Sequence, residues 1–191
     1  MDSYTQGDLF LTKPRSAKQL SFDLETQNSF DDVGGRNNLD KLRMSVGITL
    51  DFKTEQFTVY KEDEAAELCE ELLAAEFVVG FNVRRFDYRV LEPYTKKDLS
   101  KIKTIDLLEL LEVKLGHRVK LDDVARATLG TKKSGHGLQA IEWFRKGNWD
   151  DLIRYCKDDV RITADVYLFG KKNGHVLIPD WSQTKKVEVQ W

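Results

Sequence analysis

Hydrophobic and polar positions in the first part of the chain alternate with two different periods. Short apolar or alternating segments predict strands at Lys18–Asp23, Met44–Phe52, Gln56–Tyr60 and Phe77–Phe81. Before the last of these strands, apolar residues recur at helical spacing over Glu62–Glu76. The first three strands predict an antiparallel unit, whereas a strand that follows a crossover helix is expected to pair in parallel.

The remainder of the chain is mainly helical in pattern. A short helix at Arg84–Leu91 precedes a last short strand at Lys103–Leu107. Four longer periodic segments then predict helices at Leu107–Leu115, Leu121–Leu129, Gly137–Arg145 and Trp149–Phe169. Together these elements predict an α/β fold, in which a mixed β-sheet, antiparallel in its first three strands and then parallel, is flanked by α-helices.

The length of the chain, 191 residues, fits one domain that buries about 70% of its unfolded surface. We assign residues 1–17 to a flexible N-terminal arm, 18–175 to the folded domain and 176–191 to a C-terminal tail. Val187 to Trp191 alternate in polarity, which leaves an edge strand and a frayed terminus both open for the tail.

Composition excludes several classes of protein. The two cysteines and three histidines have no zinc-site spacing, and no signal pattern or long apolar run predicts secretion or a membrane span. We therefore expect a cytoplasmic protein. A net charge of −2 lacks the overall basic character of a tight non-specific nucleic-acid binder. Local basic patches nevertheless allow a nucleic-acid enzyme, and each fits either steering of a substrate or a solvated face: Lys96, Lys97, Lys101 and Lys103, and Arg118, Lys120, Lys132 and Lys133.

The first candidate for chemistry is a pair of acids at the end of the first predicted strand. Alternate side chains of a strand share a face, so Asp23 and Glu25 point the same way while Phe22 and Leu24 point to the buried side. Adjacent carboxylates repel, and a hard divalent cation such as Mg²⁺ or Mn²⁺ would turn that repulsion into coordination. Taken alone, the pair is equally compatible with a solvated strand edge.

Two further acids follow the same logic. Asp87 lies on a helix that begins where a buried strand ends at Asn82, and open mixed sheets place their sites at such strand ends. In the long helix, Tyr155 and Asp159 are four residues apart and share one face. Four carboxylates suit two metal ions that activate a water and stabilise a leaving alkoxide in phosphodiester cleavage. Because the free tyrosine pKa is about 10, Tyr155 is better suited to orient the water than to deprotonate it.

The order and spacing of these residues resemble a known family. The resemblance is carried by the motifs Asp23-x-Glu25, Asn82-xxx-Phe86-Asp87 and Tyr155-xxx-Asp159. They are similar to the three exonuclease motifs of the DEDDy branch of the ribonuclease H-like, DnaQ-like 3′-to-5′ exonucleases, most closely the YprB-like and helicase-associated members. The similarity extends from about residue 19 to residue 174 and implies a ribonuclease H-like sheet.

The resemblance also implies roles for the matching residues. Asp23, Glu25 and Asp159 would hold one Mg²⁺ or Mn²⁺, and Asp23 and Asp87 a second ion. Tyr155 would take the place of a histidine in the sister branch. The implied activity is two-metal hydrolysis of DNA or RNA from a single-stranded or 3′ end, which releases nucleoside 5′-monophosphates.

Further residues are candidates for substrate contact. Lys132, Lys133 and His136 lie in a glycine-containing basic segment that could contact phosphate, and His136 could instead cap the following helix. Asn82 either touches the substrate or fixes the turn. The alternative function is a weak or non-catalytic nucleic-acid-binding module that acts with a helicase or polymerase partner. Loss of an acid would favour that alternative, but all four acids and the tyrosine are present.

Overall fold

The computed structural model describes residues 17–131, 137–180 and 183–191. Almost all of the predicted N-terminal arm therefore lies outside the described residues, as do three of the predicted substrate contacts, Lys132, Lys133 and His136. The acidic motifs and Tyr155 are all described.

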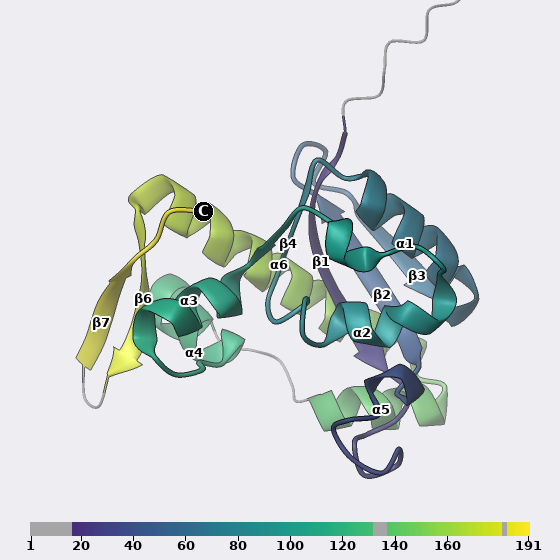
Figure 1. The fold of residues 1–191 in the computed structure, drawn as a ribbon. Coiled ribbons are helices and arrows are strands. Elements are labelled where there is room, and N and C mark those ends of the chain that lie inside the picture. Colours follow the sequence, from purple (N-terminus) through teal and green to yellow (C-terminus); the bar gives the residue numbers. More distant parts are fainter. Residues whose placement is uncertain (1–16, 132–136, 181–182) are drawn as a thin grey trace, which may run out of the picture.

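The framework is a five-stranded sheet with the order β3-β2-β1-β4-β5 (Figure 1). Its central strand, β1 (Gln19–Thr26), pairs antiparallel with β2 (Met44–Asp51) and parallel with β4 (Phe77–Gly80). The outer strands are β3 (Phe57–Lys61), antiparallel to β2, and β5 (Thr104–Asp106), parallel to β4. The predicted mixed sheet, antiparallel at first and then parallel, is confirmed.

Helices cover both faces of this sheet (Figure 1). They are α1 (Ala65–Ala74), α2 (Asp87–Leu91), α3 (Leu107–Leu115), α4 (Leu121–Leu129), α5 (Gly137–Lys146) and α6 (Trp149–Asn173). Single 3₁₀ turns occur at Leu39–Lys41, Glu62–Glu64, Glu92–Tyr94 and Leu99–Lys101. Among the described residues, no helix is long and apolar enough to cross a membrane.

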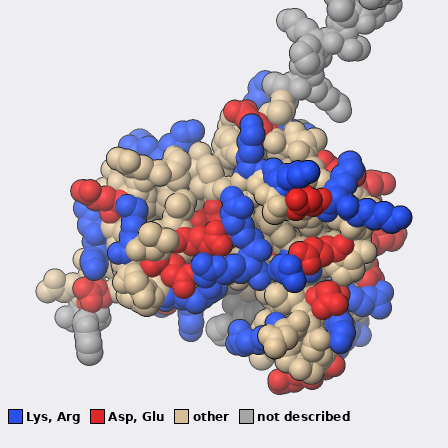
Figure 2. Space-filling view, in the orientation of Figure 1, with Lys and Arg blue, Asp and Glu red and all other residues tan. Residues whose placement is uncertain are grey.

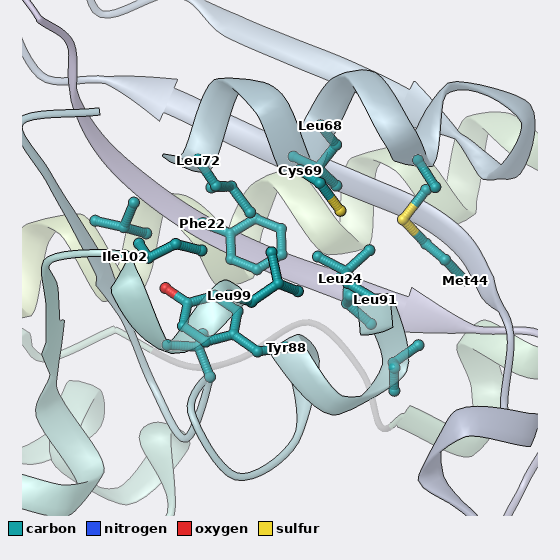
Figure 3. Packing of buried hydrophobic residues seen from close by; sticks show 14 of the residues in the cluster. Phe22, Leu24, Met44, Leu68, Cys69, Leu72, Tyr88, Leu91, Leu99 and Ile102 are labelled. Carbon is teal, nitrogen blue, oxygen red and sulfur yellow. The ribbon is translucent and has the colours of Figure 1, made fainter. Parts of the chain in front are cut away.

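One face of β1 packs against α1 and α2 (Figure 3). Phe22 lies at the centre of this layer, between Leu72 of α1 and Tyr88 of α2, whose ring centroid is 6.3 Å away. Leu20 and Leu24 are buried in the same cluster, as the alternation in the first predicted strand requires. Their burial fixes the orientation of β1, because a slip of one residue would turn these side chains to the other face.

The opposite face of the sheet is covered by α6. Val46, Ile48 and Leu50 of β2 form a second buried cluster with Leu152, Cys156 and Val160 of α6. At Ser21 of β1, a small side chain lets the helix approach closely, and its hydroxyl donates to the carbonyl of Val160 over 3.0 Å. The apolar face of α6, the longest predicted helix, therefore packs it against the sheet.

The predicted C-terminal tail is folded. β6 (His175–Asp180) and β7 (Gln183–Glu188) pair antiparallel in a separate two-stranded sheet that packs on α4 and α6. The Thr128 hydroxyl bonds both backbone groups of Leu177, and the indole of Trp191 donates to the carbonyl of Tyr167 over 3.0 Å. Val187 and Glu188 thus belong to an edge strand, one of the two options left open by the sequence, but this strand is part of the small two-stranded sheet rather than of the main sheet.

Gly80 ends β4 in a position with no room for a side chain. A Cβ there would lie 2.2 Å from Cγ1 and 3.0 Å from Cβ of Val83, a β-branched residue that cannot easily rotate away. We expect Gly80→Ala to lower the free energy of unfolding by about 1–3 kcal/mol, measured by urea denaturation. Gly47→Ala should lower the free energy of unfolding by a smaller amount, because its new methyl group meets the flexible side-chain ends of Leu68 and Met44. Equal midpoints for Gly80→Ala and the wild type would contradict this.

Candidate active site

The first two acids lie on the face of β1 that is turned toward α6. β1 extends to Thr26, further than predicted, because its pairing with β2 continues as far as Met44. Asp23 and Glu25 are therefore both within the strand, and both are partly exposed while Leu24 between them is buried. The register shifts between Glu25 and Thr26, an irregularity of the kind that re-aims side chains beside active sites.

α6 brings the third acid to this pair. Two contacts fix the helix against β1: the Ser21 bond to Val160 and a bond of 3.6 Å from the thiol of Cys156 to the carbonyl of Asp23. These contacts flank Asp159, of which only 4% is exposed. Cys156 and Ser21 thus fix the position of α6 along β1. Neither was identified from the sequence, because small residues on an apolar face carry no distinctive signal.

Asp23, Glu25 and Asp159 form a compact carboxylate cluster. One oxygen of each lies within 4.8 Å of the others. Three carboxylates this close repel one another, and hard oxygen donors in this number suit a hard divalent cation such as Mg²⁺ or Mn²⁺. The donor set therefore fits the kind of metal ion that the sequence predicted.

Asp87, at the start of α2, lies next to the strand that carries the first two acids. Its Oδ1 accepts a hydrogen bond of 3.2 Å from the backbone N–H of Leu24, the residue between the two acids of β1. Only 2% of Asp87 is exposed, and this burial raises the pKa of its carboxyl to about 7. Asp87 is not one of the three acids of the compact cluster, but its position beside Leu24 places it next to the first motif.

The connection that carries Asp87 is organised by a buried carboxylate that the sequence did not single out. Asp106 of β5 accepts hydrogen bonds from the backbone N–H groups of Asn82, Arg84, Leu108 and Glu109, at 2.8–3.3 Å. Asn82 adopts a positive φ of 73° to make this turn. As a result α2 begins at Asp87 rather than at the predicted Arg84. Asp106 lies within the part of the chain that resembles the family, about residues 19 to 174, but none of the three motifs includes it.

Tyr155 shares its face of α6 with Asp159. Only 2% of Tyr155 is exposed, and its ring centroid lies 5.7 Å from that of Trp143 of α5. The predicted helical spacing is therefore realised, with α5 packed over the tyrosine. Trp143 therefore packs against the ring of Tyr155.

Comparison with known protein families identifies the fold. A family model of the RNase H superfamily matches residues 20–168, well over half of the chain. The chain belongs to the RNase H superfamily. The match spans β1 to α6, so every acid described above lies within it. A search of the curated proteins finds no match.

Membership of the RNase H superfamily confirms the ribonuclease H-like part of the sequence prediction. It indicates a nuclease-like activity, and nucleases with this fold usually depend on divalent metal ions. The carboxylate cluster at the centre of the RNase H-like sheet agrees with both statements. The narrower family that the motifs resemble is taken up below as a proposal.

A cleft of about 730 Å³ adjoins the cluster in this RNase H-like domain. Its lining joins residues from distant parts of the chain: Leu24, Glu25, Thr26, Asn28, Ser29, Phe30, Arg36, Leu42, Phe86, Lys120, Leu138 and Ile141. An ion pair of 2.7 Å between Asp32 and Arg145 joins the segment after β1 to α5, and both of these elements contribute residues to the lining. Asn82 does not line this cleft. Its side-chain oxygen instead accepts a hydrogen bond from Arg118, consistent with a role in fixing the turn.

Proposed function

We propose that this RNase H-like domain is a metal-dependent 3′-to-5′ exonuclease of the DEDDy type, which removes nucleoside 5′-monophosphates from DNA or RNA. The observation that carries the proposal is the carboxylate cluster of Asp23, Glu25 and Asp159, with ligand oxygens within 4.8 Å of one another. The buried Asp87 beside Leu24 and Tyr155 on the face of Asp159 complete the expected set of side chains.

In this proposal Asp23, Glu25 and Asp159 would hold one Mg²⁺ or Mn²⁺, and Asp87 would hold a second together with Asp23. When bound, such a pair of ions lowers the pKa of water and stabilises the departing oxygen of an in-line displacement. The protein contributes a rigid frame: the β1 pairing and the two contacts from α6 keep the acids in place before substrate arrives. Because the pKa of Asp87 is raised to about 7, its carboxyl is only partly ionised near neutral pH. A cation close to it would favour the ionised form.

Tyr155 has the task of orienting the attacking water. Its ring is held by Trp143 and its helix by the contacts with β1, so its hydroxyl position is set by packing rather than by the substrate. A fixed hydroxyl lowers the entropy lost when the water is aligned with the scissile phosphate.

The direct test is digestion of 5′-labelled single-stranded DNA and RNA oligonucleotides with Mn²⁺, with Mg²⁺ and with a chelator. We expect a ladder that shortens from the 3′ end, requires metal and ranks DNA against RNA. The Asp23→Asn protein is the control for contaminating nuclease. If folded wild-type protein cleaves neither polymer with either metal, the exonuclease proposal fails and the non-catalytic binding module, with a helicase or polymerase partner, replaces it.

Tyr155→Phe should lower kcat for the oligonucleotide by about tenfold or more, with little change in KM, because only the water-orienting hydroxyl is lost. The ring would remain packed against Trp143. Tyr167→Phe is the matched control: it lies on the same helix, is buried, and packs with Phe52 and Phe77 away from the acids. Full activity in Tyr155→Phe would remove the tyrosine from the mechanism.

A further inference from the structure

A short non-helical segment between α3 and α4 carries two exposed basic side chains, Arg118 and Lys120, of which Lys120 lines the cleft. Lys120 has extended backbone angles, with φ −95° and ψ 145°. Val119 packs into a hydrophobic cluster, whereas Arg118 and Lys120 on either side of it are exposed. The burial therefore alternates as in a strand, and Arg118 and Lys120 project to the same side, about 6.6 Å apart along the chain.

Both side chains reach groups close to the proposed active site. Arg118 donates a 2.7 Å hydrogen bond to the side chain of Asn82, two residues after the end of β4. Lys120 lines the cleft together with Glu25 of the carboxylate cluster and Phe86. Asn82 and Phe86 belong to the same connection between β4 and α2. Lys120 therefore shares the cleft with Glu25, and Arg118 contacts the connection that carries Phe86.

The charges around Arg118 are balanced but open to solvent. Figure 2 shows Lys and Arg side chains gathered with Asp and Glu across the middle of the molecule, between α3 and α2. Here Glu109 and Glu112 of α3 pair with Arg84 and Arg85, and Glu112 lies 3.7 Å from Arg118. The Arg118 side chain is 48% exposed in this pair. Exposed ion pairs of this kind contribute about 0–1 kcal/mol, so an incoming phosphate can replace Glu112 at little cost.

We propose that Arg118 and Lys120 bind two successive phosphates of the substrate strand upstream of the nucleotide being removed. Their separation along the extended segment is comparable to the spacing of neighbouring phosphates in a single strand. Their charge suits a phosphodiester backbone and carries no base preference. The domain would thus engage several nucleotides of single strand, although its net charge is −2. This assignment rests on the proposed function, because it takes the carboxylates as the cleavage point.

Binding can be measured separately from cleavage. A fluorescent single-stranded DNA of about 12 nucleotides is titrated with protein in a chelator, and anisotropy gives Kd over a series of salt concentrations. Arg118→Gln and Lys120→Gln should each reduce the slope of log Kd against log salt by about 0.7, so that the ratio of the variant Kd to the wild-type Kd is about fivefold larger at ~0.1 M than at ~1 M salt. Lys172→Gln, an exposed residue at the far end of α6, is the control of equal charge change.

Catalysis supplies the second readout. The p-nitrophenyl ester of thymidine 5′-monophosphate carries only the phosphate that would be cleaved. With Mn²⁺, the double variant Arg118→Gln/Lys120→Gln should lose at least tenfold more kcat/KM on the oligonucleotide than on this ester. Equal losses on both substrates, or slopes equal to that of Lys172→Gln, would overturn the phosphate assignment. If salt slopes change as expected but the wild type cleaves neither substrate, the phosphate contacts stand and the exonuclease proposal fails.

Discussion

Asp23→Asn is expected to lower oligonucleotide cleavage by about three orders of magnitude or more, because the residue belongs to the three-acid cluster and is the proposed shared ligand. An asparagine keeps the shape of the side chain but removes the charge that binds a divalent cation. The measurement is the initial rate of 3′ shortening with saturating Mn²⁺. Retention of full activity would exclude the site assignment.

Although Asp23→Asn should lose activity, it should be more stable than the wild type when no metal is bound. Without metal, the close carboxylates repel by roughly 1 kcal/mol per pair in a water-like dielectric, so Asp23→Asn should unfold at a higher temperature than the wild type. With Mn²⁺ at about 100 times its Kd, the wild type should gain about 2.7 kcal/mol, and the variant should gain little. Thermal unfolding with Mn²⁺ and with a chelator measures both effects.

Two further variants make the result specific. Asp159→Asn should reproduce the loss of activity and of metal-induced stabilisation, since it removes another member of the cluster. Asp158→Asn is the matched control, because the neighbouring residue lines a different cavity on the outer side of α6 with Phe57 and Lys157. A loss of metal-induced stabilisation in Asp158→Asn equal to that in Asp159→Asn would contradict a metal site at the cluster.

Asp106→Ala should lower the free energy of unfolding by about 2–4 kcal/mol. The buried carboxylate accepts from four backbone N–H groups, which the alanine would leave without these bonds. It also caps α3, and loss of a cap adds to the effect. Urea denaturation measures the stability. Because the turn to Asp87 would loosen, kcat should fall as well, even under conditions where the variant remains folded.

Asp98→Ala provides the comparison for Asp106→Ala. Asp98 also caps a helical turn, but it is exposed, and among the described residues its side chain accepts hydrogen bonds only from the backbone N–H and the hydroxyl of Ser100. Asp98→Ala should lower the free energy of unfolding by well under half as much as Asp106→Ala does, and it should leave kcat unchanged. If both aspartate variants unfold at the same urea concentration, the buried network around Asp106 does not carry the stability assigned to it.

Much of the fold could be predicted because local patterns and global packing agree. The alternation at Phe22 and Leu24 correctly placed Asp23 and Glu25 on one face, since burying one side of a strand forces the other outward. The bounds Leu107–Leu115 and Leu121–Leu129 were predicted correctly, and left-handed glycines follow both helices. These features depend on residues close together in the chain.

Other features depend on contacts between distant residues, and the sequence did not predict them. Nothing local indicates that Asp106 would bind the turn at Asn82, so the start of α2 was placed too early. The tail folds because Trp191 packs over Gly170 and bonds the carbonyl of Tyr167, both on α6. Short segments with weak periodicity take their structure from such partners.

The sequence by itself determined the order of the elements, the faces of β1 and α6, and the residue types from which a metal site could be made. Only the tertiary structure decided that Asp23, Glu25 and Asp159 lie within one ion's reach and that Asp87 lies beside Leu24 rather than within that cluster. The physical reason is that periodicity specifies the direction of a side chain, whereas distance between strand and helix is set by packing. Here that packing depends on Ser21 and Cys156, whose contacts hold α6 against β1.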